Sequence, residues 1–379
     1  MPSTSNMRST LVPPFKADVV GSLLRPQNLL DARAKLAKGE LSRDALWDLE
    51  RQSVARAVEL QKSAGLKVCT DGEYHRRHWF MDFVERIDGV GLEGGLKTTF
   101  RSDEGPIEFA PPRVVTRGKL GRTRPLALNE FNDLKPIAEA SGLIPKQAIP
   151  SPTLLHFRSG RAGVDAKAYP DMAEFFADLA RVYREEIAAL YQAGCRYLQI
   201  DETNFPFLCD PKLHDHVRSI GEDPVSIQKT YAKLLNDVTR DRPADLRICI
   251  HMCRGNHESS WVASGGYEPV AEIAFGTLDV DGFFLEYDTD RAGGFEPLRH
   301  LSGNKVAVLG LVTTKKPALE SKDALKRRID EAAKYVSLER LALSPQCGFA
   351  STIGGNKLTE DDERRKLELV VETAREVWG

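Results

Sequence analysis

The sequence has no long apolar run and almost no excess of charge of either sign. Its hydrophobic stretches fall short of the about 18 apolar residues that cross a membrane, and its first residues, MPSTSNMRSTLV, lack the apolar segment of a secretory signal. The 53 basic and 55 acidic residues leave a formal charge of −2, without a basic cluster for nucleic acid or an anionic membrane. We therefore expect a cytoplasmic protein with small-molecule partners, no nucleic acid and no membrane.

Cysteine is also scarce, with six residues in a chain of 379. Without a secretion signal, so few cysteines are reduced thiols or metal ligands rather than a disulfide framework. The composition is otherwise that of a globular protein, 41% hydrophobic and 28% charged. Because no repeat, low-complexity tract or Pro/Gly/Ser-rich linker divides the chain, we expect a single catalytic domain over residues 1–379.

Short β-branched and apolar runs alternate with long amphipathic segments, a pattern typical of βα units and a parallel sheet. The clearest helix spans residues 171–192, where apolar residues recur every three or four positions until Gly194 ends it. Eight strands are expected, at 17–22, 67–73, 147–153, 196–202, 247–253, 282–288, 305–312 and 340–348. Eight such units close most naturally into a (β/α)8, or TIM, barrel.

The segment at residues 91–125 interrupts this rhythm with glycines, prolines and basic residues. It predicts a hairpin inserted between the second and third units. Two roles remain open for it, a lid or interface element and a plain surface loop.

Polar residues gather where the expected strands end, which is where a TIM barrel carries its active site. His251 and Cys253 are two residues apart on one strand, so both side chains point the same way. An isolated pair of this kind is more often a buried thiol beside a hydrogen-bonded histidine. Glu286 and Cys347, however, end two further expected strands, and the four side chains together suit Zn²⁺.

Two thiolates, an imidazole and a weakly bound carboxylate favour one kind of chemistry at such an ion. An incoming thiol that displaces Glu286 would have its pKa lowered by the metal and would attack as a thiolate. Zinc sites that activate water instead keep an open position and use a nearby carboxylate as base. The sequence therefore predicts alkylation of a thiol.

Several segments resemble the catalytic domain of cobalamin-independent methionine synthase, and more closely its short single-domain relatives. The resemblance runs over nearly the whole chain and is most specific in VVGSLLRP, DGEYHRRHWF, LQIDETNF, HMCRGN, FFLEYDTDRAGGFEPL and LSPQCGFAST. It implies a TIM barrel, zinc held by His251, Cys253, Glu286 and Cys347, and methyl transfer to homocysteine, which gives methionine.

The resemblance also implies how homocysteine is bound. Gly21 and Ser22 would meet its carboxylate through backbone and hydroxyl groups, and Glu73 and Asp201 would pair with its ammonium, since a buried zwitterion needs both charges met. The alternative for the two carboxylates is an ion pair with a neighbouring arginine.

The chain departs from the family on the methyl-donor side. His156 and Phe157 stand where the family has a tryptophan that stacks on folate, and Thr313 lies where the family has a histidine for proton transfer. His75 belongs to a basic and aromatic run, residues 74–79, that either lines the pocket or is a solvated helical turn. These residues, His75, His156, Phe157 and Thr313, are the candidates for a donor pocket. The chain also has no room for the second barrel of the full-length enzyme.

Alternatives therefore stay open at this point. The donor is 5-methyltetrahydrofolate, a methylated corrinoid protein, or a small onium or ether compound. Three alternative functions also remain. The protein could transfer an epoxide or other electrophile to a different thiol with zinc, it could be a metal-free lyase similar to uroporphyrinogen decarboxylase, or it could bind a thiol without catalysis. A homodimer is compatible with exposed barrel helices.

Overall fold

The computed structural model describes residues 12–95, 98–102, 104–110 and 112–379. Its centre is a parallel six-stranded sheet in the order β12-β11-β10-β9-β8-β7. The strands are β7 (Gln147–Pro150), β8 (Tyr197–Glu202), β9 (Arg247–Met252), β10 (Gly282–Glu286), β11 (Val306–Val312) and β12 (Leu341–Pro345). Each of them lies within an expected strand, at most with its ends shortened.

The remaining gap is closed by the first two expected strands, which confirms the TIM-barrel prediction. β1 (Val68–Cys69) pairs in parallel with β6 (Ile144–Pro145), and Ala17 forms a parallel bridge to Leu343 of β12. The strands expected at 17–22 and 67–73 are therefore both shorter than expected. β1 ends early because Gly72 and Glu73 adopt left-handed backbone angles, with φ of 67° and 59°.

The first segment forms only a bridge because a side chain competes for its backbone. The Asp18 carboxylate accepts hydrogen bonds from the backbone N–H groups of Phe15 and Val19, at 3.1 and 2.8 Å. Such local bonding offers the chain an alternative to a regular ladder.

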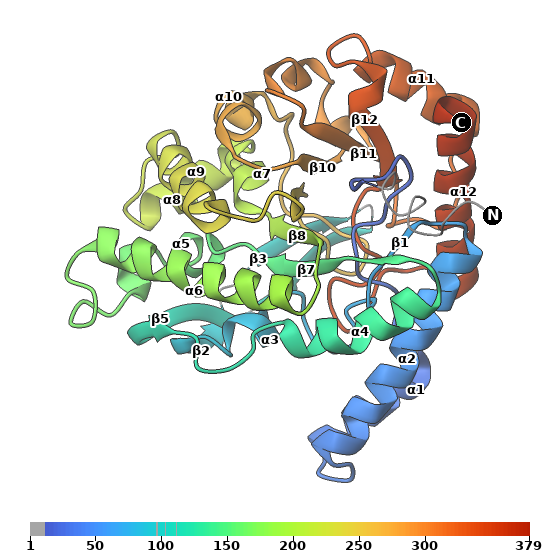
Figure 1. Cartoon of the computed structure of the whole chain (residues 1–379). Coiled ribbons are helices and arrows are strands. Elements are labelled where there is room, and N and C mark those ends of the chain that lie inside the picture. Colours follow the sequence, from blue (N-terminus) through green and yellow to red (C-terminus); the bar gives the residue numbers. More distant parts are fainter. Residues whose placement is uncertain (1–11, 96–97, 103, 111) are drawn as a thin grey trace.

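Long helices surround the strands, and α1 and α2 project from the body of the molecule (Figure 1). The predicted helix at 171–192 is confirmed as α6, whose first turn is capped by the Asp171 side chain on the Ala173 N–H. The helices are α1 (Gln27–Ala37), α2 (Arg43–Ser63), α3 (Met81–Val84), α4 (Leu128–Ala140), α5 (Leu154–Phe157), α6 (Met172–Gln192), α7 (Asn204–Leu208), α8 (His214–Ser219), α9 (Ser226–Thr239), α10 (Glu268–Thr277), α11 (Lys322–Ala332) and α12 (Glu360–Trp378).

The predicted insertion is a two-part antiparallel ribbon between the second and third units. β2 (Asp88–Gly95) pairs with β5 (Pro112–Gly121), and β3 (Thr98–Ser102) pairs with β4 (Gly105–Phe109). Arg101 of β3 exchanges two backbone hydrogen bonds, of 2.6 and 2.9 Å, with Trp261 in the loop that follows β9. The tip of the ribbon, β3 and β4, is therefore docked over the end of the barrel where the polar residues gather.

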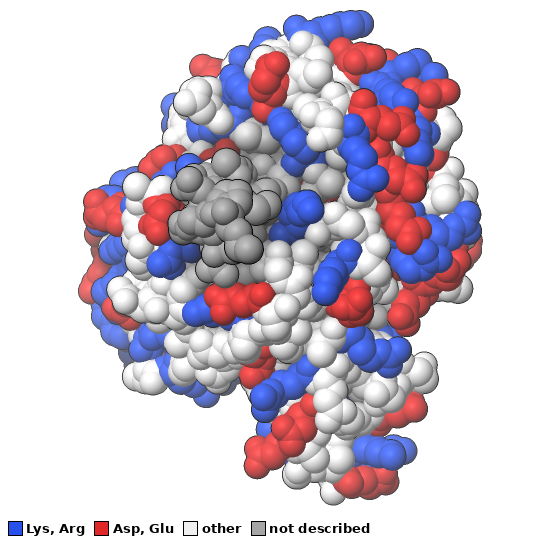
Figure 2. Space-filling model, turned by 45° about the vertical axis from the view of Figure 1, so that its right-hand side comes forward, with Lys and Arg blue, Asp and Glu red and all other residues white. Residues whose placement is uncertain are grey.

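The surface agrees with the balanced composition. Figure 2 shows acidic and basic side chains intermixed over the visible face, without a broad region of one sign. In the described part of the chain, no helix combines the length and apolar character needed to cross a bilayer.

Candidate metal and substrate site

Three of the four predicted metal ligands lie together above the barrel. His251 and Cys253 come from β9 and the residue after its end, and Cys347 follows β12. Their ligand atoms all lie within 4.8 Å of one another, and all three side chains are buried. The Cys347 Sγ is 3.6 Å from the His251 Nε2. Strand spacing and barrel closure thus bring residues 94 positions or more apart into one group that could hold a metal ion.

The electrostatics of this group suit a cation. A hydrogen bond from the Cys253 thiol, helped by His251, holds the pKa of Cys347 well below its usual range, although burial opposes it. The same hydrogen bond raises the pKa of Cys253, so the two sulfurs share one proton. The buried Nδ1 of His251 has no hydrogen-bond partner in the described part of the chain. A dication such as Zn²⁺ can replace the shared proton and accept both sulfurs and an imidazole nitrogen.

Glu286 lies beside the three ligands but outside their group. It is fully buried at the end of β10, and its carboxylate accepts hydrogen bonds from the Arg254 N–H at 2.8 Å, the Gln346 amide at 3.1 Å and the Arg291 guanidinium. Burial alone would raise its pKa, but Lys315, Arg291 and Arg254 together lower the pKa to about 2. Glu286 is therefore an anion held by three donors next to the predicted metal position.

Glu73 and Asp201 line the same cavity as the three ligands. Burial raises the pKa of both groups, that of Glu73 to about 8 with a further contribution from Asp201. Arg76 is the neighbouring arginine of the alternative interpretation, but its nearest nitrogen is 4.0 Å from the Glu73 carboxylate. The Glu73 Oε2 is buried without a hydrogen-bond partner. Among the described residues, no cation donates a hydrogen bond to either carboxylate, and a substrate ammonium would supply one.

Ser22 lines the cavity and ties the first barrel segment to the loop that carries Cys347. Its hydroxyl accepts from the Ala350 N–H at 3.3 Å, and its carbonyl accepts from the Phe349 N–H at 2.8 Å. The Gly21 carbonyl accepts from the Thr70 hydroxyl at 2.6 Å. Gly21 is not among the described residues that line the cavity, whereas its neighbours Val20 and Ser22 are.

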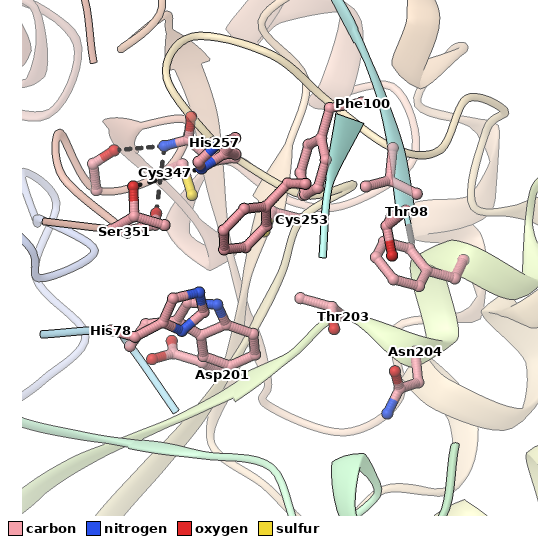
Figure 3. A pocket seen from close by; sticks show the side chains of 18 of the residues that line it. His78, Thr98, Phe100, Asp201, Thr203, Asn204, Cys253, His257, Cys347 and Ser351 are labelled. Carbon is pink, nitrogen blue, oxygen red and sulfur yellow. Dashed lines mark hydrogen bonds between the residues drawn. The ribbon is translucent and has the colours of Figure 1, made fainter. Parts of the chain in front are cut away.

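The cavity has a volume of about 420 Å³ and is closed on one side by the tip of the ribbon. Figure 3 shows Cys347 and Ser351 on one side of it and Thr98 of the ribbon and Asn204 on the other. Phe109 of β4 stacks on His257 with ring centroids 4.3 Å apart, and its ring also lies 6.0 Å from that of His78 and 6.2 Å from that of Phe100. Aromatic side chains form much of the wall, namely Trp79, Phe100, Phe109, Phe157 and Phe207.

Among the predicted donor-pocket residues, Phe157 lines this cavity, and His75, His156 and Thr313 do not. His156 is turned toward Tyr231, whose hydroxyl is 3.1 Å from its Nδ1. The backbone N–H of Thr313 donates to Glu320. A single turn of helix, α5, is enough to direct His156 and Phe157 to different sides.

His75 belongs to a separate buried cluster behind the cavity. Its ring nitrogens lie 3.4 Å from Asp71 and 3.3 Å from Asp133, and its ring packs on Trp47 with centroids 4.5 Å apart. Burial lowers its pKa, but the hydrogen bonds with Asp133 and Asp71 outweigh burial and raise the pKa to about 9. This arrangement makes His75 a structural ion-pair residue.

Sequence reasoning did not identify His78 and His257 individually, nor the ribbon aromatics Phe100 and Phe109. Burial, and then Arg158, lowers the pKa of His78 to about 3, and burial lowers the pKa of His257. Both imidazoles are therefore neutral near pH 7. His78 was visible only as a member of the basic run at 74–79, and nothing local in the sequence marks the ribbon aromatics.

Comparisons with known proteins agree with this geometry. Residues 15–376 match the family described as "Cobalamin-independent synthase, Catalytic domain". The chain belongs to this family. It is 46% identical to the uncharacterized protein YxjH of Bacillus subtilis, over 96% of this chain and 95% of that protein. It is 24% identical to a methionine synthase of Pyrococcus abyssi, over 89% and 87% of the two chains.

Solved structures of the cobalamin-independent synthase family share the fold. A putative vitamin-B12 independent methionine synthase from Listeria monocytogenes is 37% identical and superposes with a TM-score of 0.78, covering 98% of this chain and 100% of that one. A B12-independent methionine synthase from a Shewanella species, solved with selenomethionine, gives a TM-score of 0.70 at 18% identity over 96% and 97% of the chains. This chain is thus a methyltransferase-type family member built on a TIM barrel.

Proposed function

We propose that this protein is a zinc-dependent methyltransferase that methylates the thiol of homocysteine and produces methionine. The observation that carries the proposal is the buried group of His251, Cys253 and Cys347, which opens on the same cavity as Glu73 and Asp201. A thiol-binding metal position beside two carboxylates that receive no hydrogen bond from a described cation matches an amino acid that carries both a thiol and an ammonium group.

His251, Cys253 and Cys347 would hold the zinc ion, and Glu286 is the nearby carboxylate available as a further ligand. When bound, zinc supplies a Lewis acid that keeps the acceptor sulfur as a thiolate at neutral pH. Glu73 and Asp201 bind the ammonium, and Ser22 with the backbone around it meets the carboxylate. The ribbon covers the cavity and excludes water from the reacting atoms.

The methyl donor is proposed to bind against the aromatic wall. Phe157 and its aromatic neighbours offer flat apolar surface to a planar ring such as that of 5-methyltetrahydrofolate. A methylated corrinoid protein or a small onium or ether compound is the alternative donor. A metal-free lyase has no use for three converging soft ligands, so the metal group favours thiol methylation.

The test is to incubate zinc-loaded protein with homocysteine and methyltetrahydrofolate and to detect methionine by mass spectrometry. Methionine above the level of a Cys253→Ser control supports both the acceptor and the donor. If homocysteine binds but no methionine forms, the folate donor is wrong. If homocysteine does not bind to the zinc-loaded protein, the proposed acceptor is wrong.

A further inference from the structure

We infer that Arg158 is an anion-binding residue of the cavity and holds a carboxylate or phosphate group of the methyl donor. This inference rests on the proposed function, because it assigns part of the donor in that reaction. Arg158 follows α5 directly, next to Phe157, and both residues line the cavity. A planar donor that stacks on Phe157 would therefore place its substituents close to a guanidinium.

Arg158 has no anionic partner within the described residues, and none of them accepts a hydrogen bond from its guanidinium. Its Nε is buried without a partner, and its guanidinium lies over the Phe80 ring, 4.8 Å from the centroid. Burial lowers its pKa to about 10, without an opposing contribution from a carboxylate. A partly buried cation of this kind costs stability unless a ligand neutralises it.

Two other buried arginines near the cavity donate several hydrogen bonds to carbonyl groups, although the Arg25 Nε, like the Arg158 Nε, has no hydrogen-bond partner among the described residues. Arg25 donates to the carbonyls of Ala350, Thr352, Glu73 and Arg76 at 2.9 to 3.2 Å. Arg254 similarly donates to the carbonyls of Gly265 and Glu286. Arg158 is different because it faces a cavity instead of a shell of acceptors.

Arg158 is one of three Lys or Arg side chains among the described residues that line the cavity; the others are Lys212 and Arg101, which lies 3.7 Å from Asp210. His78 is the neighbouring imidazole whose pKa Arg158 helps to lower, and at about 3 it is neutral near pH 7. The cavity thus has acidic groups, Glu73 and Asp201, for the ammonium of the acceptor and a separate cation for an anion. A planar, bidentate guanidinium suits a carboxylate or phosphate.

The experiment is isothermal titration of the zinc-loaded protein with glutarate and with inorganic phosphate, at constant ionic strength in chloride. One anion is expected to bind, and Arg158→Gln is expected to weaken that binding roughly tenfold or more, since a charge-assisted hydrogen bond is lost. The matched control is Arg218→Gln, which removes an exposed arginine of α8 paired with Asp215 and should leave binding unchanged. Preference for glutarate or for phosphate identifies the anionic group.

A structural role for Arg158 predicts a different result. If Arg158 serves to bind a ligand, the ligand-free Arg158→Gln variant will melt at the same temperature as the wild type or higher, because a poorly compensated charge is removed. A lower melting temperature, equal anion binding by Arg158→Gln and wild type, or no anion binding by the wild type would overturn the inference. The acceptor site is tested separately by adding homocysteine to the cobalt-substituted protein and recording the change in its absorption spectrum. If homocysteine causes no change, the result counts against the proposed function and not against Arg158.

Discussion

Replacing Gly348 by alanine tests whether the loop that carries Cys347 is seated directly on the end of the first barrel segment. A Cβ atom at Gly348 would lie 1.8 Å from the Ser22 Oγ, 2.9 Å from its Cβ and 3.0 Å from its backbone nitrogen. The loop cannot simply retreat, because the Phe349 N–H donates to the Ser22 carbonyl at 2.8 Å. Either Ser22 rotates away or the loop, with Cys347, is displaced.

The magnitude follows from these contacts. Overpacking costs about 1–3 kcal/mol, and loss of the hydrogen bond from the Ala350 N–H to the Ser22 hydroxyl adds about 1 kcal/mol. We expect a destabilisation of about 3 kcal/mol; with an unfolding entropy of about 2.1 cal/mol/K per residue, the melting temperature falls by about 4 °C. Calorimetry at fixed zinc concentration measures the shift, and metal analysis of the same samples reports on displacement of Cys347.

A second substitution makes this prediction specific. Ser22→Gly removes both side-chain atoms that the new methyl group would meet, so the double variant should recover most of the lost stability, with a coupling energy of about 0.5–3 kcal/mol. If Gly348→Ala melts as wild type and retains zinc, or if Ser22→Gly brings no recovery, the reasoning is refuted.

Three further variants test other parts of the structure. Cys347→Ser should lose at least about tenfold in zinc affinity by competition with a chelator, whereas Cys195→Ser, at a buried thiol between α6 and β8, should retain zinc; equal affinities would contradict the ligand assignment. The pKa of His75 is raised in the folded state to about 9. Its protonation therefore adds about 3 kcal/mol to the free energy of unfolding below pH 6.5, and this contribution is lost as the pH rises through 9. Urea unfolding across this range should show the decline in wild type and in His300→Gln but not in His75→Gln. Phe109→Ala should speed alkylation of Cys347 in metal-free protein, measured by mass spectrometry, because the ribbon loses its stacking on His257; an unchanged rate would mean that Phe109 does not cover the site.

The barrel was predictable because its strands follow a simple order and each alternates with an amphipathic helix. The ends of strands were less predictable, since the left-handed turn after β1 includes Glu73 as well as Gly72, and nothing in the sequence marks a glutamate for that conformation. The ribbon was expected from its composition, but its docking on Trp261 depends on a contact 160 residues away in the chain. The sequence around the ribbon gives no indication of such a distant partner.

The grouping of His251, Cys253 and Cys347 was the most predictable part of the site, whereas Glu286, the predicted fourth ligand, lies outside that group. His251 and Cys253 share a strand face by simple geometry, and strand order places Cys347 at the same end of the barrel. The donor side was harder because its residues lie in short turns. His75 and His78 are three positions apart, yet one is buried behind the cavity and the other lines it. The phase of an irregular turn cannot be derived from residue spacing.

The fold divides the two halves of the proposed reaction between different kinds of structure. The thiol half rests on strand ends, at His251 of β9, Cys253 directly after β9 and Cys347 after β12. The donor half is built from the ribbon and from the turn that carries Phe157 and Arg158. Loops can change without cost to the barrel core. His156, Phe157 and Thr313, the positions at which the resemblance to the family pattern fails, are not members of the group formed by His251, Cys253 and Cys347. Selection for a different donor would therefore act on the ribbon and the Arg158 turn while the thiol chemistry stays constant.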